Sequence, residues 1–154
     1  MIAIRGVGPA DAEAMSDVLI ASIRDLCTED HNNIADTLAQ WTANKTPEGV
    51  RAMMANPDLM LFLAERDGAP AAVGAVTATG EIALNYVAPQ HRFAGVSRVL
   101  LATMEGALKR AGITEARLVS TRTAHRFYRD AGWQDVETAA GDAPVAGILM
   151  RKKL

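Results

Sequence analysis

Residues 86–101 read YVAPQHRFAGVSRVLL. An apolar, strand-like run ends at Pro89, a short polar turn follows, and the small residues Ala94, Gly95 and Ser97 lie at the start of a helix with an apolar face. The first N–H groups of a helix have no partner within it, and the helix dipole adds partial positive charge there. Small side chains let a pyrophosphate approach these amides, so the stretch predicts a phosphate-binding turn. The alternative is that Gly95 only marks the start of the helix, because a single glycine often precedes a helix.

The composition predicts one globular domain over residues 1–154, because 49% of the chain is hydrophobic and 22% is charged. The net charge of −2 argues against a nucleic-acid-binding face, which needs clustered Lys and Arg. No apolar run reaches the ~18 residues of a membrane span, and the first residues lack the pattern of a signal peptide. We therefore expect a soluble, cytoplasmic protein with no nucleic-acid or membrane partner.

Cysteine and histidine are too few for a metal site or a disulfide framework. The single cysteine, Cys27, lies on an apolar helical run, which favours a buried structural thiol over a nucleophile. The three histidines are scattered and show no metal-ligand spacing.

The N-terminal third predicts a short strand followed by helices. Ile2 and Ile4 suggest the strand, and Thr46 followed by Pro47 is a strong start signal for a helix. The expected helices run from 9 to the polar cluster 28–33, over 34–41, and from 46 to 56.

The rest of the chain predicts mainly strands, with turn signals between them. We expect strands at 59–65, 71–77 and 81–87, a helix from the phosphate-binding turn to Gly112, a strand at 115–120, a helix at 124–131, and strands at 134–138 and 145–151. The element order is thus β-α-α-α-βββ-α-β-α-ββ.

Two segments of the second half carry a resemblance to a known family. Residues 92–97, Arg-Phe-Ala-Gly-Val-Ser, are similar to the pattern R/Q-x-x-G-x-G/A at a helix start. Residues 124–133, AHRFYRDAGW, are similar to A-x-x-(F/L)-Y-x-x-x-G-(F/W). Together they resemble the GNAT N-acetyltransferase family. The resemblance implies an α/β (α+β), GNAT-like acyl-CoA N-acyltransferase fold, in which helices flank a mixed, mostly antiparallel central sheet.

Two positions depart from the family pattern. Phe93 stands where many members have Gly, and Ser97 stands where they have Gly or Ala. Because Phe does not easily adopt a positive φ, we expect a slightly different loop or a ring that packs on the cofactor. Ser97 remains small, and its hydroxyl is suited to donate to a phosphate oxygen.

The resemblance implies an N-acetyltransferase that moves an acetyl group from acetyl-CoA to a primary amine, by direct transfer in a ternary complex. The acceptor is a small-molecule amine or a peptide amine, and a homodimer through the C-terminal strands is left open. One alternative is a non-catalytic CoA-binding sensor or regulatory module. Another is an unrelated α/β domain, although the nucleotide motifs G-x-x-x-x-G-K-[ST] and G-x-G-x-x-G are absent.

The resemblance also implies roles for individual residues. Tyr128 is the candidate acid for the departing thiolate, the alternative being a core anchor. Glu81 is the candidate base, because it lies on the strand that holds the catalytic glutamate in some family members, and strand alternation places it on one face with Asn85; a solvated charge is equally open. The expected cofactor contacts are Val87 through its N–H, Arg92, Phe93, Ala94, Gly95, Val96, Ser97, Arg98, Thr121 and Arg129. The expected acceptor contacts are Arg24, His31, Trp41 and Ser120.

Overall fold

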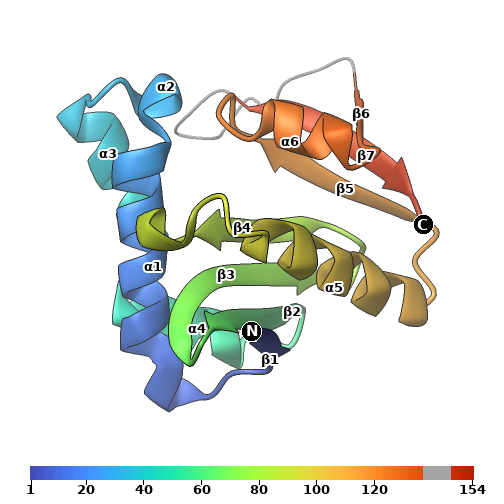
Figure 1. The fold of residues 1–154 in the computed structure, drawn as a ribbon, viewed down its shortest axis with the longest axis horizontal. Coiled ribbons are helices and arrows are strands. Elements are labelled where there is room, and N and C mark those ends of the chain that lie inside the picture. Colours follow the sequence, from blue (N-terminus) through green and yellow to red (C-terminus); the bar gives the residue numbers. More distant parts are fainter. Residues whose placement is uncertain (137–146) are drawn as a thin grey trace.

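The computed structural model describes residues 1–136 and 147–154 (Figure 1). Its main sheet has four antiparallel strands in the order β1-β2-β3-β4. Their bounds are β1 Ile2–Arg5, β2 Leu59–Arg66, β3 Ala69–Thr77 and β4 Ile82–Val87.

Helices cover both faces of this sheet. The helices before β2 are α1 Ala12–Leu26, α2 Thr28–His31, α3 Ala35–Thr42 and α4 Pro47–Ala55. Apolar side chains of α1 and α4 pack with Leu63 and Val73 on one face. On the other face α5, Val96–Arg110, packs Leu100 and Met104 against the sheet. A Cβ on Gly74 of β3 would lie 2.7 Å from the sulfur of Met104, so this glycine lets α5 approach the sheet closely.

The C-terminal part of the chain forms a second sheet in the order β5-β7-β6. It consists of β5 Glu115–Ser120, β6 Gln134–Asp135 and β7 Ile148–Lys153, with α6 His125–Asp130 between β5 and β6. The two sheets meet at one parallel bridge between Glu81 and Arg117. Beyond this bridge β4 and β5 diverge, as Figure 1 shows, and the space between them becomes the site described below.

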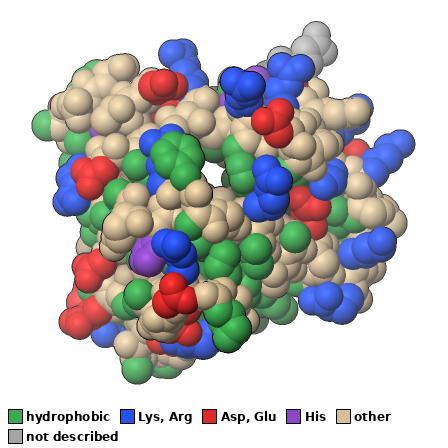
Figure 2. All heavy atoms as spheres, in the orientation of Figure 1, with side chains coloured by type: hydrophobic (Ala, Val, Ile, Leu, Met, Phe, Trp, Pro, Cys, Tyr) green, Lys and Arg blue, Asp and Glu red, His purple; other side chains and the backbone are tan. Residues whose placement is uncertain are grey.

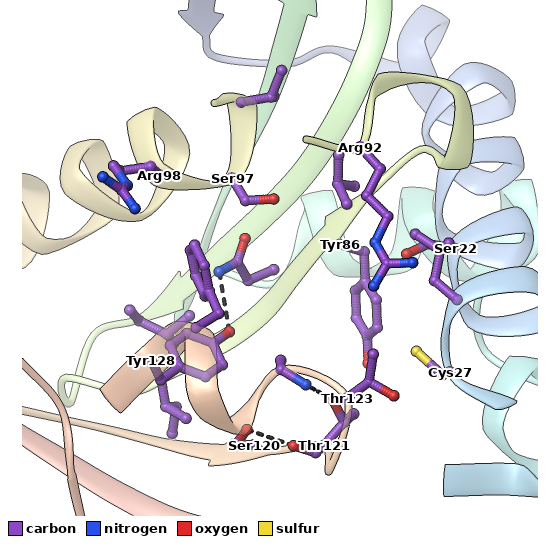
Figure 3. Close-up of a pocket in the computed structure, with 18 of the residues that line it drawn as sticks. Ser22, Cys27, Tyr86, Arg92, Ser97, Arg98, Ser120, Thr121, Thr123 and Tyr128 are labelled. Atoms are coloured by element: carbon purple, nitrogen blue, oxygen red, sulfur yellow. Dashed lines mark hydrogen bonds between the residues drawn. The ribbon is translucent and has the colours of Figure 1, made fainter. Parts of the chain in front are cut away.

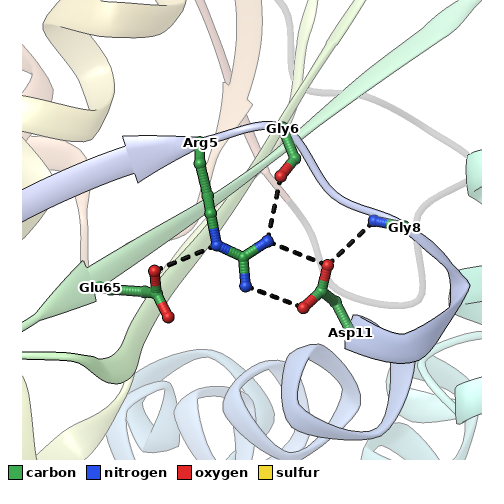
Figure 4. Close-up of polar contacts among 5 residues, drawn as sticks. All are labelled: Arg5, Gly6, Gly8, Asp11 and Glu65. Carbon is green, nitrogen blue, oxygen red and sulfur yellow. Dashed lines mark hydrogen bonds and ion pairs between the residues drawn. The ribbon is translucent and has the colours of Figure 1, made fainter.

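Arg5 fastens the N-terminal strand to the turn that leads into α1 (Figure 4). Its guanidinium donates to both carboxylate oxygens of Asp11, at 2.8 and 3.1 Å, and to Glu65 at 3.1 Å. Asp11 also accepts from the N–H of Gly8 at 2.9 Å. These bonds hold the pKa of Asp11 at about 2, first through Arg5 and then through Gly8. They fix the short 3-10 turn, η1 Pro9–Asp11, from which α1 crosses the sheet.

The predicted elements are found with small shifts at their ends. The strand at 115–120 is placed as expected, and the helix at 124–131 is α6. The polar cluster 28–33 is not a plain helix end, because it contains α2 and then turns at Asn32 with φ 52°. The expected strands at 134–138 and 145–151 are β6 and β7 where described; 137–146 lie outside the described residues. Among the helices described, none is both long and apolar enough to cross a bilayer.

Candidate active site

A cavity of about 560 Å³ lies where β4 and β5 diverge. Its walls come from the end of α1, from β4, from the start of α5, and from the segment that joins β5 to α6. Figure 2 shows a hollow in this face, with hydrophobic and basic side chains at its border. Figure 3 shows the lining side chains pointing in from these separate elements.

One wall is the phosphate-binding turn predicted from the sequence. Gly95 is the residue before α5 and has φ 83°, and no side chain caps this end of the helix. The first intrahelical bond runs from the N–H of Val99 to the carbonyl of Gly95, so the amides of residues 96–98 have no partner within the helix. A Cβ on Gly95 would meet nothing within 4 Å. Helix amides without an internal partner, with room beside Gly95, suit a pyrophosphate.

The backbone at Phe93 differs from the expectation that a bulky side chain avoids a positive φ. Phe93 adopts φ 64°, a left-handed conformation that residues other than glycine rarely take. Its ring is 91% exposed, and the guanidinium carbon of Arg92 lies 4.7 Å from the ring centre. The loop therefore keeps its turn in spite of the bulky residue, at the cost of local backbone strain.

Tyr128 enters the cavity from α6 and is held by Asn85 of β4. The side-chain amide of Asn85 donates to the Tyr128 hydroxyl oxygen at 3.0 Å. The hydroxyl thus uses an oxygen lone pair for Asn85 and keeps its own proton for another acceptor. Burial raises the pKa of Tyr128 to about 12, and the bond from Asn85 opposes this in part. Tyr128 is therefore protonated at every pH at which the protein is expected to work.

A β-bulge in β4 changes the position expected for Glu81. Ala83 has no partner on β3, whereas Ile82 and Leu84 on either side of it do. Ile82 consequently packs in the cluster under α5 and Leu84 in the cluster under α1 and α4, so strict alternation fails here. Glu81 does not share a face with Asn85; it is exposed and does not line the cavity. The position of Glu81 outside the cavity argues against its predicted role as the base.

The backbone of β4 presents polar groups to the cavity. The N–H of Ala88 donates to the carbonyl of Ala71 at 2.7 Å. Bonded and non-bonded pairs alternate along an antiparallel ladder, and Val87 lies one pair further along, opposite Ala72. The N–H of Val87 therefore points away from β3, toward the gap between β4 and β5. This is the direction that its predicted contact with the thioester oxygen requires.

The wall opposite α5 is built from side chains of distant segments. The indole N–H of Trp41 donates to the hydroxyl of Tyr86 at 3.2 Å, and Tyr86 lines the cavity. Cys27 lies beside them, and burial raises the pKa of its thiol to about 12. Burial likewise raises the pKa of Tyr86. This wall is therefore neutral and hydroxyl-bearing, with Ser22 at its edge.

Asp30 of α2 joins this wall to the segment after β5. Its carboxylate accepts from the N–H of Arg122 at 2.5 Å, and from the N–H and hydroxyl of Thr123 at 3.3 and 2.7 Å. These contacts span 92 and 93 residues of sequence and hold α2 across one end of the cavity. All the side-chain hydrogen bonds that Asp30 accepts from described residues come from this segment.

Three of the expected acceptor contacts do not reach the cavity. Arg24 is exposed and pairs with Asp25 at 2.9 Å. His31 is fully buried: its Nδ1 accepts from a backbone N–H at 2.9 Å, so Nε2 carries the proton and donates to the carbonyl of Ile23 at 2.8 Å. Trp41 does not line the cavity, and it is joined to the cavity wall by its hydrogen bond to Tyr86. These corrections share one cause, which is that each polar group is already satisfied within the protein.

Of the other residues predicted to contact the cofactor or the acceptor, some line the cavity and others do not. Ser120 lines the cavity, but its hydroxyl donates to the carbonyl of Thr121 at 2.7 Å. Thr121 also lines it, and its hydroxyl accepts from the N–H of Ala124 at the start of α6. Ala94 packs against the core, and Arg129 is exposed, outside the lining. Val87, Arg92, Phe93, Gly95, Val96, Ser97, Arg98, Ser120, Thr121 and Tyr128 all line the cavity.

The family is decided by a model of the acetyltransferase (GNAT) domain, which matches residues 21–154. The chain belongs to the GNAT acetyltransferase family. The fold is therefore the GNAT fold. No curated protein sequence matches the chain significantly.

Solved structures share the GNAT fold over nearly the whole chain. A GCN5-related N-acetyltransferase from Rhodopseudomonas palustris has a TM-score of 0.88 at 20% identity, covering 99% of this chain and 95% of its own. The PaiA N-acetyltransferase from Thermoplasma acidophilum, in complex with coenzyme A, has 0.80 at 20% identity, covering 100% and 99%. The ribosomal-protein-S18-alanine N-acetyltransferase from Escherichia coli has 0.68 at 17% identity, covering 99% and 94%.

Sequence reasoning missed Tyr86 in this GNAT cavity and gave Asn85 no role. Neither carries a local signal, because each is defined by a hydrogen bond to a residue more than 40 positions away. Asp30 lies in the polar cluster 28–33, but the sequence does not show which groups its carboxylate binds. Within the described part of the chain, no group of His, Cys, Asp or Glu is arranged to hold a metal ion.

Proposed function

We propose that this protein is an N-acetyltransferase that moves an acetyl group from acetyl-CoA to a primary amine, by direct transfer in a ternary complex. The observation that carries the proposal is one cavity that holds both unpaired helix amides and a buried, protonated tyrosine. The amides suit an anion, and the tyrosine suits a leaving group that gains negative charge. Membership of the GNAT family and the coenzyme A bound to the Thermoplasma relative support this assignment.

The start of α5 fits the pyrophosphate of the cofactor. The amides of Val96, Ser97 and Arg98 would hold it, with the hydroxyl of Ser97 as a further donor. Gly95 contributes by keeping the space in front of these amides open. Bound acetyl-CoA supplies a thioester as the acetyl donor.

The chemistry is a balanced acyl exchange. The amine nitrogen forms a bond to the acetyl carbon, the carbon–sulfur bond breaks, the nitrogen loses one proton, and the sulfur gains one. The N–H of Val87 would donate to the carbonyl oxygen as it becomes negative, and such donors typically contribute several kcal/mol. The proton from nitrogen goes to water, because no carboxylate of the described residues lines the cavity.

Tyr128 acts on the leaving sulfur. Its pKa of about 12 lies well above the ~8.5 of an ordinary thiol, so the hydroxyl mainly stabilises the thiolate by donating a hydrogen bond, and the sulfur then takes its proton from water. Asn85 orients it, since a bond to the hydroxyl oxygen leaves the O–H free to point elsewhere. Asn85 is thus a positioning residue.

Calorimetric titration with acetyl-CoA, desulfo-CoA and ATP tests cofactor binding, and thiol release with a panel of amines tests turnover. Selective binding of acetyl-CoA together with amine-dependent thiol release would support the proposal. Binding without turnover by any amine would instead support a CoA-binding sensor on the same fold. No binding by the folded protein would overturn both.

A further inference from the structure

The Arg, Lys, Asp and Glu side chains that line the cavity are two arginines. They are Arg92 and Arg98, and no Asp or Glu among the described residues joins them. Asp30 is an acidic group whose charge acts on the wall opposite α5, because it raises the pKa values of both Cys27 and Tyr86. Its carboxylate is already occupied by three donors of the segment after β5. The cavity therefore offers a cationic acceptor nothing to pair with.

The two arginines lie on different sides of the cavity. Figure 3 shows Arg98 beside Ser97 at the start of α5, while Arg92 extends across toward Ser22 of α1 and Cys27, the residue after α1. The charge of Arg92 also acts on the Cys27 thiol, in the direction that lowers its pKa. Arg98 is thus associated with the phosphate-binding turn and Arg92 with the opposite wall.

The guanidinium of Arg92 is available to a ligand. It forms no ion pair or side-chain hydrogen bond with any described residue, and its one specific contact is the face of the Phe93 ring at 4.7 Å. A guanidinium recognises a carboxylate through two parallel N–H donors, and stacking on an aromatic ring orients it without using those donors. Ser22 adds a hydroxyl on the same wall.

The same wall is otherwise neutral and largely apolar. Its surface comes from Leu26, Cys27, the ring of Tyr86 and Val87. A ligand that fits it has an uncharged side chain against this wall and an anion that reaches Arg92. Its amine must point toward Asn85 and Tyr128, where the acetyl group would be transferred.

From this arrangement we infer that the acceptor is a small amino acid with a neutral side chain, whose carboxylate is bound by Arg92 and Ser22 and whose amine is acetylated. The inference rests on the proposed function and names its substrate class. Arg92 is on this basis a specificity-determining residue for the acceptor and not a ligand of the cofactor phosphates.

The test compares matched acceptors, namely phenylalanine, phenylalaninamide and phenethylamine, with spermidine as a polycation. Thiol release with acetyl-CoA gives kcat/KM for each, for wild type, Arg92→Gln, Arg92→Lys and Arg98→Gln. Phenylalanine should exceed its amide at least about 10-fold in the wild type. Arg92→Gln should remove about 10- to 100-fold for phenylalanine, mainly in KM, and leave the amide and the acetyl-CoA Kd nearly unchanged. Arg98→Gln should instead weaken the binding of acetyl-CoA, and it should do so to the same extent whichever acceptor is used.

Equal or better turnover of the amide, the amine or spermidine would overturn the inference. So would an Arg92→Gln variant with weakened acetyl-CoA binding and an equal loss for all acceptors, since Arg92 would then act on the cofactor. Calorimetry of phenylalanine and its amide into CoA-loaded protein gives a readout without turnover, and no preference for the acid there also overturns it. Failure of acetyl-CoA binding in any form contradicts the proposed function itself, which separates the two results.

Discussion

The two walls of the cavity are built in different ways. The wall at α5 comes from one continuous segment, residues 93–98, and its donors are backbone amides. The opposite wall is lined from α1 and β4, with Arg92 extending toward it, and is supported from behind by Trp41 of α3 through Tyr86 and by Asp30 of α2 through Thr123. A site made of local backbone depends on conformation and tolerates varied side chains, whereas a site made of distant side chains depends on each residue and on the packing that holds it.

The largest effect is expected from filling the backbone-built wall. Gly95→Glu places bulk and negative charge where the pyrophosphate would lie, and should weaken acetyl-CoA binding by about 100-fold or more. Gly112→Glu is the matched control, because Gly112 also has a positive φ and nothing within 4 Å of its Cβ, but lies past the other end of α5. Calorimetric titration measures both. Retained affinity in folded Gly95→Glu would place the cofactor elsewhere.

Tyr128→Phe comes second and separates chemistry from binding. Loss of the hydroxyl should lower kcat by roughly 100-fold and leave the acetyl-CoA Kd similar. Tyr86→Phe is its counterpart, since it also removes a cavity hydroxyl with one side-chain partner. It should act chiefly on the acceptor KM. Unchanged turnover in Tyr128→Phe, measured by thiol release, would remove this residue from the mechanism.

The third prediction breaks the contact that holds the side-chain wall together. Asp30→Ala removes the acceptor for two backbone amides and the Thr123 hydroxyl, and should lower the free energy of unfolding by about 1–3 kcal/mol. The acceptor KM should rise as well, while acetyl-CoA binding stays the same. Urea denaturation gives the stability, and Glu29→Ala on the same helix is the control. Equal stability of the two variants would mean that the contact contributes nothing in solution.

The fourth prediction concerns alkaline pH. Burial raises the pKa values of Cys27, Tyr86 and Tyr128 above their ordinary values of 9.0 and 10.0. The folded protein thus keeps these protons to higher pH than the unfolded chain, so their stabilisation is complete below about pH 9 and is lost as pH rises toward 12. The loss should be on the order of 1–2 kcal/mol by pH 10.

Urea denaturation between pH 7 and pH 10 measures this loss. Cys27→Ser and Tyr128→Phe should each flatten the profile, because they remove one of the groups that releases a proton on unfolding. A profile that stays flat in the wild type would show that the side-chain wall is open to water.

The smallest effect is expected at Phe93. Its φ of 64° is strained for any residue with a Cβ, so Phe93→Gly should raise the free energy of unfolding by about 1 kcal/mol. Phe93→Ala keeps the strain and also loses the ring, which makes it the proper control. If the two variants unfold alike, strain at this turn is negligible. Neither change should abolish acetyl-CoA binding, because the donors there are amides.

The accuracy of sequence-based reasoning followed this division between the walls. The turn at Gly95, the helix after it and the position of Tyr128 were predicted, because a positive φ, small residues and helix caps act over a few positions. Glu81 was misplaced because a bulge at Ala83 shifts the alternation of β4. His31 and Arg24 were misplaced because polar side chains near a site are as often satisfied within the protein.

The sequence by itself determined the element order, the turn at Gly95 and the family, since these depend on residues close together in the chain. Only the tertiary structure decided which side chains face the cavity. Asn85 meets Tyr128, Trp41 meets Tyr86, and Arg92 extends toward α1, each through packing of segments far apart in sequence. The physical reason is that hydrogen bonding and burial belong to a place in the fold, whereas propensity and capping belong to neighbours along the chain.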